Sequence, residues 1–150
     1  MPLILEALNA GKSVRFSPMG VSMLPMLRQG IDTVTLSPLP EHLSKYDIPL
    51  YRRTNGKYVL HRIVAVDETY TCMGDNQVEP EPGLRHEQMI ALVTAFSRNG
   101  RTIPVTDPGY RLYCRLWVAS WPVRKLHRRL RNKLRKIRHR IQSKSGESHH

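Results

Sequence analysis

The sequence predicts a mainly β domain, preceded by one short helix and followed by one basic amphipathic helix. Over the first two thirds of the chain apolar residues alternate with polar ones, whereas near the C-terminus they recur every three or four residues. A chain of 150 residues is long enough to bury one core and too short for two full-sized domains. We therefore expect a folded domain over residues 1–107, a helical tail over 108–142 and a disordered polar end over 143–150.

A short helix is predicted over residues 3–10. Leu5 and Leu8 are three positions apart and so share one side of a helix. Gly11 follows directly, and glycine is favoured just after a helix because it adopts a positive φ without strain.

The segment 12–105 is predicted to be all β. Residues 14–16 alternate apolar and polar side chains, and Asn55-Gly56 separates two apolar runs as a hairpin turn does. The run 57–66 is almost continuously apolar and rich in β-branched residues, so we expect one central strand covered on both faces. Further strands are expected at residues 33–36, 70–73, 90–96 and 102–105.

The net charge of +12 is concentrated in the tail. The chain has 24 Lys and Arg against 12 Asp and Glu, and residues 111–150 hold 13 of the basic residues but only one acid, Glu147. Residues 1–110 are neutral overall. In the tail the apolar residues step by four, four, three and four, which predicts a helix with one narrow apolar stripe. The stripe consists of Leu126, Leu130, Leu134, Ile137 and Ile141.

Three partners fit a basic amphipathic tail over residues 110–142. An anionic membrane surface is favoured, because Trp117 and Trp121 lie beside the stripe and tryptophan prefers the membrane interface. Nucleic acid is the second, through its phosphates, although no base-reading motif accompanies the charge. The third is protein, with the stripe packed on the β core or on another copy. The closing His149-His150 resembles a tag remnant as much as a ligand pair.

Neither a secretory signal nor a membrane-spanning segment is expected. Glu6 precedes the first basic residue, Lys12, which is the reverse of a signal peptide. The longest stretch without a charged residue, 16–27, has 12 residues and falls short of the ~20 that a spanning helix needs. We therefore expect a cytoplasmic protein that is free or peripheral on the inner face of the membrane.

The two cysteines predict no disulfide framework and no metal site. Cys72 lies in a strand pattern and Cys114 in the tail, and neither has neighbouring residues of the kind that bind zinc. We expect no redox role for either thiol, and no metal ion or organic cofactor.

Three short segments of the β region combine into a possible catalytic set. Residues 20–25 place Ser22 between a glycine and a proline-stiffened turn, a geometry that exposes a hydroxyl and directs backbone N–H groups at one point. His61 lies inside an apolar strand, and Asp75 ends the next one. A serine needs a base to become a nucleophile, and an imidazole serves best when a carboxylate determines its tautomer.

These segments resemble a known family when they are taken together. Ser-Met-Leu-Pro at 22–25, Asp-Thr-Val-Thr-Leu at 32–36, His-Arg-Ile-Val at 61–64 and Gly-Asp-Asn at 74–76 occur in the order seen in signal peptidase I and in the LexA and UmuD self-cleaving peptidases. The resemblance covers roughly residues 12–105. It implies a signal-peptidase/LexA-like β fold.

The resemblance also implies roles for individual residues. Ser22 becomes the nucleophile, and His61 takes the position of the general base, as in the signal peptidases of the endoplasmic reticulum and of archaea. Asp75 matches the aspartate of the Gly-Asp-Asn box. The second acid of the family has no aspartate here, and Glu79 and Glu81 are the nearest carboxylates.

This sequence differs from many signal peptidases at the oxyanion hole, and it offers a second candidate for the general base. Gly20 stands where many signal peptidases have a serine, so backbone amides, chiefly that of Ser22 together with Gly20, are expected to bind the oxyanion. Lys57 lies four residues before His61 and is a rival base.

The sequence therefore predicts a serine endopeptidase that acts without a cofactor. Its expected substrate is a leader or signal-type peptide, or one dedicated protein partner. Self-cleavage is a further option, since Ala10-Gly11 resembles the scissile pair of LexA. The alternative is a non-catalytic module of the same fold that binds peptide, lipid or nucleic acid.

Overall fold

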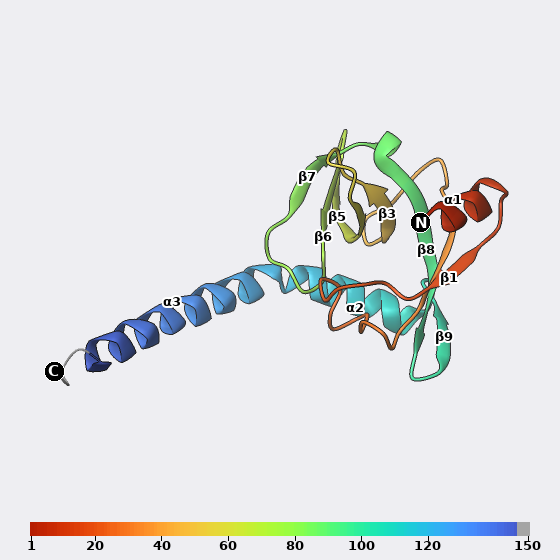
Figure 1. Cartoon of the computed structure of the whole chain (residues 1–150). Helices are drawn as coiled ribbons and strands as arrows, with labels where there is room; N and C mark the ends of the chain where they lie inside the picture. Colours follow the sequence, from red (N-terminus) through yellow and green to blue (C-terminus); the bar gives the residue numbers. More distant parts are fainter. Residues whose placement is uncertain (147–150) are drawn as a thin grey trace. The chain divides into compact units, whose positions relative to one another are not determined.

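The computed structural model describes residues 1–146, and their contacts form two compact units. The first unit runs from Met1 to Trp117, and the second begins at Val118 (Figure 1). Helices make up 33% of the chain and strands 29%, and the strands are antiparallel with a curled arrangement. The prediction of a mainly β protein is therefore right only for the core of the first unit, because the two C-terminal helices are long.

The predicted opening helix is confirmed as α1 (Pro2–Asn9). Pro2 stands in its first turn, where a missing N–H costs nothing, and Leu8 is buried against the β core. Gly11 follows with a φ of +77°, a conformation that glycine adopts without strain.

The larger sheet has six antiparallel strands with the long β8 (Met89–Arg98) at its centre. Its other strands are β1 (Val14–Phe16), β2 (Val34–Pro38), β3 (Pro49–Arg52), β4 (Tyr58–Leu60) and β9 (Arg101–Pro104). The order is β1-β2-β8-β3-β4, with β9 also paired to β8, so β4 is an edge strand. The predicted hairpin at Asn55-Gly56 joins β3 to β4, and Gly56 has a φ of +87°.

The run 57–66 is not one central strand, which corrects the prediction. The chain leaves β4 at Leu60 and enters β5 (Arg62–Val66) of a second, three-stranded sheet with β6 (Tyr70–Met73) and β7 (Glu81–Leu84). Most residues of the run are apolar because β4 borders a cleft and the start of β5 is buried. His61 is the residue at the junction between the two sheets.

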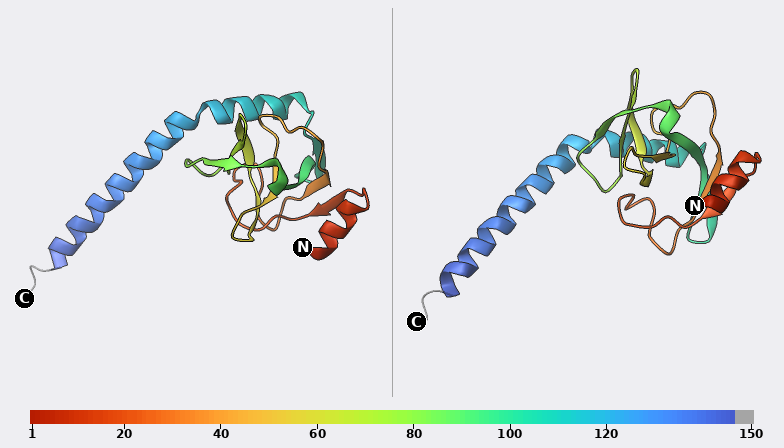
Figure 2. Two further views of the ribbon diagram at one scale, coloured as in Figure 1. Left: turned by 90° about the horizontal axis from the view of Figure 1, so that it is seen from above. Right: turned by 45° about the horizontal axis from the view of Figure 1, so that its top comes forward.

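Helix α2 (Pro108–Ala119) packs on the β core, as Figure 2 shows. Its buried side chains are Tyr110 and Cys114, which are four residues apart and so share one face. The Tyr110 ring lies 4.9 Å from that of Phe96 on β8. The first compact unit therefore ends at Trp117, not at residue 107 as predicted, because the first turns of α2 complete the core.

The second unit is dominated by α3 (Trp121–Gly146), a helix of 26 residues. The C-terminal region forms two helices, since α2 ends at Ala119 and α3 begins at Trp121. The expected disorder is wrong for residues 143–146, which continue the helix, and the Ser143 hydroxyl donates to the Arg140 carbonyl at 3.0 Å. Residues 147–150, with the His149-His150 pair, lie outside the described part. Within residues 1–146 no helix combines the length and the apolarity needed to cross a membrane.

Candidate active site

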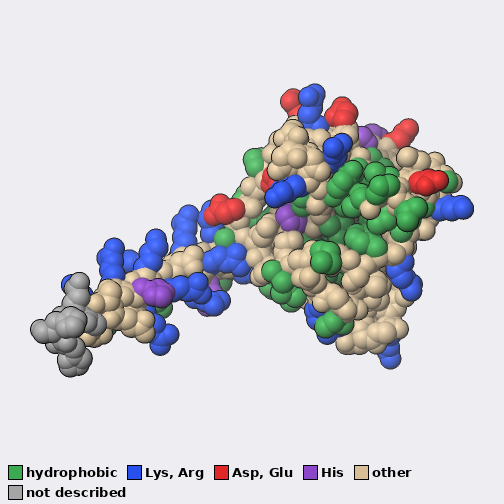
Figure 3. Space-filling view, in the orientation of Figure 1, with side chains coloured by type: hydrophobic (Ala, Val, Ile, Leu, Met, Phe, Trp, Pro, Cys, Tyr) green, Lys and Arg blue, Asp and Glu red, His purple; other side chains and the backbone are tan. Residues whose placement is uncertain are grey.

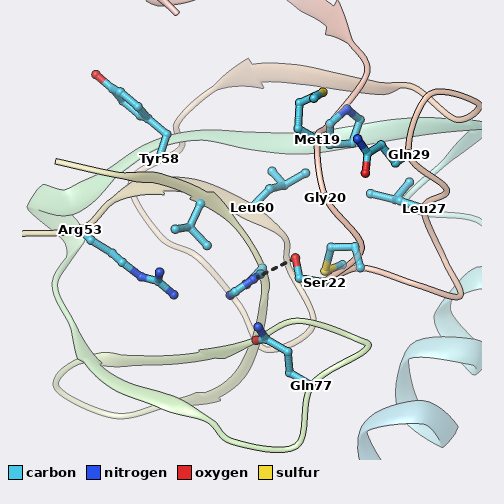
Figure 4. A pocket seen from close by; sticks show the side chains of 13 residues that line it. Met19, Gly20, Ser22, Leu27, Gln29, Arg53, Tyr58, Leu60 and Gln77 are labelled. Carbon is cyan, nitrogen blue, oxygen red and sulfur yellow. Dashed lines mark hydrogen bonds between the residues drawn. The ribbon is translucent and has the colours of Figure 1, made fainter. Parts of the chain in front are cut away.

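The fold brings Ser22 and His61 together although they are 39 residues apart. Nε2 of His61 lies 3.2 Å from Oγ of Ser22 (dashed line in Figure 4). Ser22 belongs to the loop between β1 and β2, and His61 to the junction between β4 and β5. The two atoms form a hydrogen bond. A general base needs this contact in order to take the serine proton.

The Gly-Asp-Asn box holds the loop that carries Ser22. The amide of Asn76 donates to the carbonyl oxygen of Ser22 at 2.8 Å. Gly74 lies against the same carbonyl, so that a Cβ added to Gly74 would stand 2.5 Å from the oxygen. No larger residue fits at position 74 without a shift of the loop, and this close approach explains why a glycine is found there.

An ion pair between Arg28 and Asp32 lies near the C-terminal end of the loop that carries Ser22. The guanidinium of Arg28 donates to both carboxylate oxygens of Asp32, with Nε at 2.9 Å from Oδ2 and Nη2 at 3.0 Å from Oδ1. The Arg28 amide adds a third bond at 2.8 Å. Hydrogen bonding from Arg28 lowers the pKa of Asp32. Asp32, the first residue of the second motif, thus has a structural role in this fold.

Backbone amides beside Ser22 are available to bind an oxyanion. Gly20 has a φ of +91°, a conformation that favours glycine. In the part of the chain that the structure describes, the N–H groups of Gly20 and Ser22 donate no hydrogen bond to another residue. Such amides can stabilise the charge on a tetrahedral intermediate when they point at it.

The partner on the other nitrogen of His61 is Tyr51, not the expected Asp75. The Tyr51 hydroxyl lies 3.3 Å from Nδ1 of His61 and 3.5 Å from Oε2 of Glu81. A hydroxyl that donates to Glu81 accepts from Nδ1–H, and we assign this tautomer because it leaves Nε2 free to accept the Ser22 proton. Nothing in the sequence around Tyr51 distinguished it from an ordinary strand tyrosine.

Asp75 neutralises a buried arginine instead. Nε and Nη2 of Arg62 donate to its two carboxylate oxygens at 2.8 and 2.9 Å, and the Tyr113 hydroxyl donates to Oδ2 at 2.8 Å. The side chains of Arg62 and Asp75 are 0% and 2% exposed. A buried charge needs such a partner, so an arginine inside an apolar strand was the sequence signal for this pair.

Helix α2 supplies further partners for this ion pair. Nη1 of Arg62 donates to the Tyr110 hydroxyl at 2.9 Å and lies 2.8 Å from Sγ of Cys114. Nε1 of Trp117 donates to the main-chain carbonyl of Asp75 at 2.9 Å. The indole N–H of Trp117 is therefore engaged with the β core.

Burial keeps the imidazole of His61 neutral. The residue is 4% exposed, and burial together with the nearby Arg53 guanidinium lowers the pKa of His61 to about 4. Burial also raises the pKa of Tyr51, so its hydroxyl keeps its proton. At neutral pH both groups are in the protonation state that general-base catalysis by His61 requires.

The candidates for the second acid and for the rival base lie in different places relative to Ser22 and His61. Glu81 stands behind Tyr51 and forms an ion pair with Arg53, with Oε2 2.6 Å from Nη2. Glu79 is exposed. Lys57 is exposed in the hairpin turn and does not line the cleft, whereas His61 lies in the cleft beside Ser22.

The possible self-cleavage pair Ala10-Gly11 and the two cysteines do not line the cleft. Ala10 and Gly11 are exposed at the end of α1 and are not among the residues that line the cleft. Cys72 and Cys114 are both buried, and burial raises the pKa of Cys72 to about 12, so that this thiol is unreactive at neutral pH.

Ser22 and His61 lie in a cleft of about 230 Å³ (Figure 4). The wall combines polar side chains such as Gln29 and Gln77 with apolar ones such as Met19, Leu27 and Leu60. The edge strand β4 borders the cleft through all three of its residues. An unpaired strand edge beside a nucleophile offers backbone groups to an extended peptide.

No family model, curated protein or solved structure matches this chain. Its function is therefore inferred from the geometry of the cleft and from the motifs that surround it.

Proposed function

We propose that the protein is a serine endopeptidase with Ser22 as nucleophile and His61 as general base. One observation carries the proposal: the 3.2 Å hydrogen bond between a cleft serine and a buried, neutral imidazole. We further infer that the two curled antiparallel sheets are a signal-peptidase/LexA-like β fold. The order of the four motifs supports this, together with the position of Ser22 and His61 in one cleft and of Gly74 against the Ser22 carbonyl.

The proposed reaction is acyl transfer through a covalent intermediate. Oγ of Ser22 attacks the peptide carbonyl carbon while its proton passes to Nε2 of His61. The amides of Gly20 and Ser22 stabilise the oxyanion. When the intermediate collapses, the C–N bond breaks and the leaving amine takes the proton from His61. Water, deprotonated by His61, then releases the acyl group from Ser22.

An extended peptide fits the cleft as an added strand. The free edge of β4 pairs with its backbone, and the scissile carbonyl then lies beside Ser22. The wall made by Met19, Leu27 and Leu60 favours small or apolar side chains near the cut. A leader or signal-type peptide, or a segment of one dedicated protein, has this chemistry.

The alternative is a peptide-binding module without catalysis. It is favoured by the low pKa of His61 and by the neutral partner on its Nδ1, since a hydroxyl stabilises an imidazolium less than a carboxylate does. Both functions use the same cleft, and they differ in whether Ser22 forms a covalent bond.

Intact-mass spectrometry with a serine-directed penem or peptidyl warhead separates the two. We expect one adduct on the parent protein and none on Ser22→Ala or His61→Ala. Ser13→Ala, which changes an exposed serine outside the cleft, is the matched control and should label like the parent. If the folded parent stays unlabelled, or if Ser22→Ala labels equally, the peptidase proposal is wrong.

A further inference from the structure

Helix α3 carries a dense positive charge and contains no acidic residue of its own. Residues 121–146 include 11 Lys and Arg and no Asp or Glu. Figure 3 shows basic side chains projecting along the helix. Like charges three or four residues apart repel each other, so this helix gains nothing from ion pairs of its own. A negatively charged partner therefore relieves this repulsion, whereas a second copy of the same helix adds to it.

The apolar stripe of α3 is open to solvent. Its members are between 44 and 66% exposed: Leu126, Leu130, Leu134, Ile137 and Ile141. Val123, which is 70% exposed, falls in line with them. At 100° per residue these side chains lie within an arc of about 80°, which makes one continuous seam along the helix.

We propose that α3 lies in the surface of an anionic membrane, with this stripe facing the acyl chains and the Lys and Arg side chains contacting lipid phosphates. A lipid surface offers negative charge beside an apolar layer that runs the whole length of the stripe. Nucleic acid offers the phosphates alone, and it would leave the stripe exposed to water. Trp121 marks the start of the helix and is half-buried under Lys125, whose Nζ is 5.0 Å from the ring centroid.

The narrow stripe and the high charge predict binding that depends strongly on lipid charge. Each Lys or Arg near an anionic surface strengthens partitioning about fivefold, whereas a stripe of this width gives only modest binding to neutral lipid. The full chain should float with vesicles of equimolar phosphatidylglycerol and phosphatidylcholine. It should not float with phosphatidylcholine alone, and high salt should release it.

Two full-length variants test the two halves of the proposal. The stripe variant is Leu130→Gln, Leu134→Gln and Ile137→Gln, which keeps every charge. The polar-face variant is Arg131→Gln, Arg135→Gln and Arg138→Gln, which keeps the stripe. We expect the stripe variant to lose flotation and the polar-face variant to weaken about 100-fold. Circular dichroism confirms that both retain their helix content.

A duplex oligonucleotide provides the competing partner. Under the proposal, any binding of duplex is unaffected in the stripe variant, because the phosphates contact only the basic side chains. The proposal is overturned if the parent does not float with the anionic vesicles, or if the stripe variant floats as well as the parent. These outcomes are independent of covalent labelling at Ser22.

Discussion

The hydroxyl of Tyr51 lies 3.3 Å from Nδ1 of His61, on the side of the imidazole away from Ser22. Tyr51 is fully buried at 0% exposure, and its proton is directed at Glu81. A neutral hydroxyl therefore takes the position that a carboxylate occupies in a Ser-His-Asp triad. Tyr51 acts on Ser22 only through His61, which makes it a positioning residue.

Substitution of Tyr51→Phe should slow acylation of Ser22 by about tenfold to a hundredfold, because the tautomer and orientation of His61 are no longer determined by a hydrogen bond. The rate of adduct formation by mass spectrometry measures this. Tyr70→Phe is the matched control, since the Tyr70 hydroxyl also lies 3.2 Å from Nδ1 of a histidine, His86, but outside the cleft. Equal rates in both variants would mean that Tyr51 does not position His61.

The acylation rate should stay constant from neutral pH down to about pH 5 and fall with a midpoint near 4. The reason is that His61 acts as a base only when neutral, and burial lowers its pKa to about 4. With the ordinary pKa of 6.5, only about 10% of the imidazole would be neutral at pH 5.5. The rate of Ser22 acylation, measured across this pH range on protein shown to be folded by circular dichroism, distinguishes a His61 pKa of about 4 from the ordinary value of 6.5. A midpoint near 6.5 would contradict the buried state of the base.

Gly74→Ala should reduce acylation about a hundredfold, because the added Cβ would stand 2.5 Å from the Ser22 carbonyl and displace the nucleophile from His61. Gly74 does not have a positive φ, so the substitution adds no backbone strain of its own. Gly109→Ala is the control, since its Cβ would meet only the end of the Asp107 side chain at 3.2 Å. An unchanged rate in Gly74→Ala would show that the loop adapts.

Asp75→Asn should destabilise the fold by about 3–5 kcal/mol, since it leaves the buried Arg62 guanidinium without a counter-charge. Urea unfolding measures the loss. The fraction of protein that remains folded should still label at Ser22, because Nδ1 of His61 is held by Tyr51. A variant that is as stable as the parent but unlabelled would instead identify Asp75 as the catalytic acid of the triad.

Two truncated chains should show that α2 is needed for the fold and that α3 is not. A chain that ends at Ser120 keeps Tyr110, Cys114 and Trp117 on the Arg62–Asp75 pair and should label at Ser22 like the full chain. A chain that ends at residue 109 exposes the buried pair and should unfold. Labelling and thermal unfolding of both chains are the measurements. Full labelling of the shorter chain would show that α2 is dispensable.

Much of the β core could be predicted because side-chain alternation is a local property. The opening helix, the hairpin at Asn55-Gly56 and a strand over 90–96, which the structure extends to Met89–Arg98, follow from period, turn chemistry and β-branched residues. The run 57–66 was predicted as one strand because periodicity cannot tell a strand covered on both faces from two strands in different sheets. The pairing of β5 with β6, which sets Arg62 opposite Met73, places the second half of the run in another sheet.

In the candidate site, too, some residues could be predicted from local sequence and others only from the pairing of the strands. Ser22 and His61 could be proposed from the sequence because each stands in a motif whose chemistry is local: a serine after a glycine turn, and a histidine in an apolar strand. The partner of His61 could not, because an aspartate near the end of a strand and a tyrosine in the middle of another are equally plausible until the sheets are paired. The register of β3 against β4 brings Tyr51, rather than Asp75, to Nδ1.

The sequence by itself determined where charge and apolar periodicity lie, and so it determined the neutral β core, the basic helix with its stripe and the presence of a serine and a histidine suited to acyl transfer. The tertiary structure alone decided that α2 belongs to the core, that Asp75 neutralises Arg62 and that Tyr51 orients His61. The physical reason is that a buried charge or imidazole takes the partner that lies nearest in space, and the nearest groups come from distant parts of the chain.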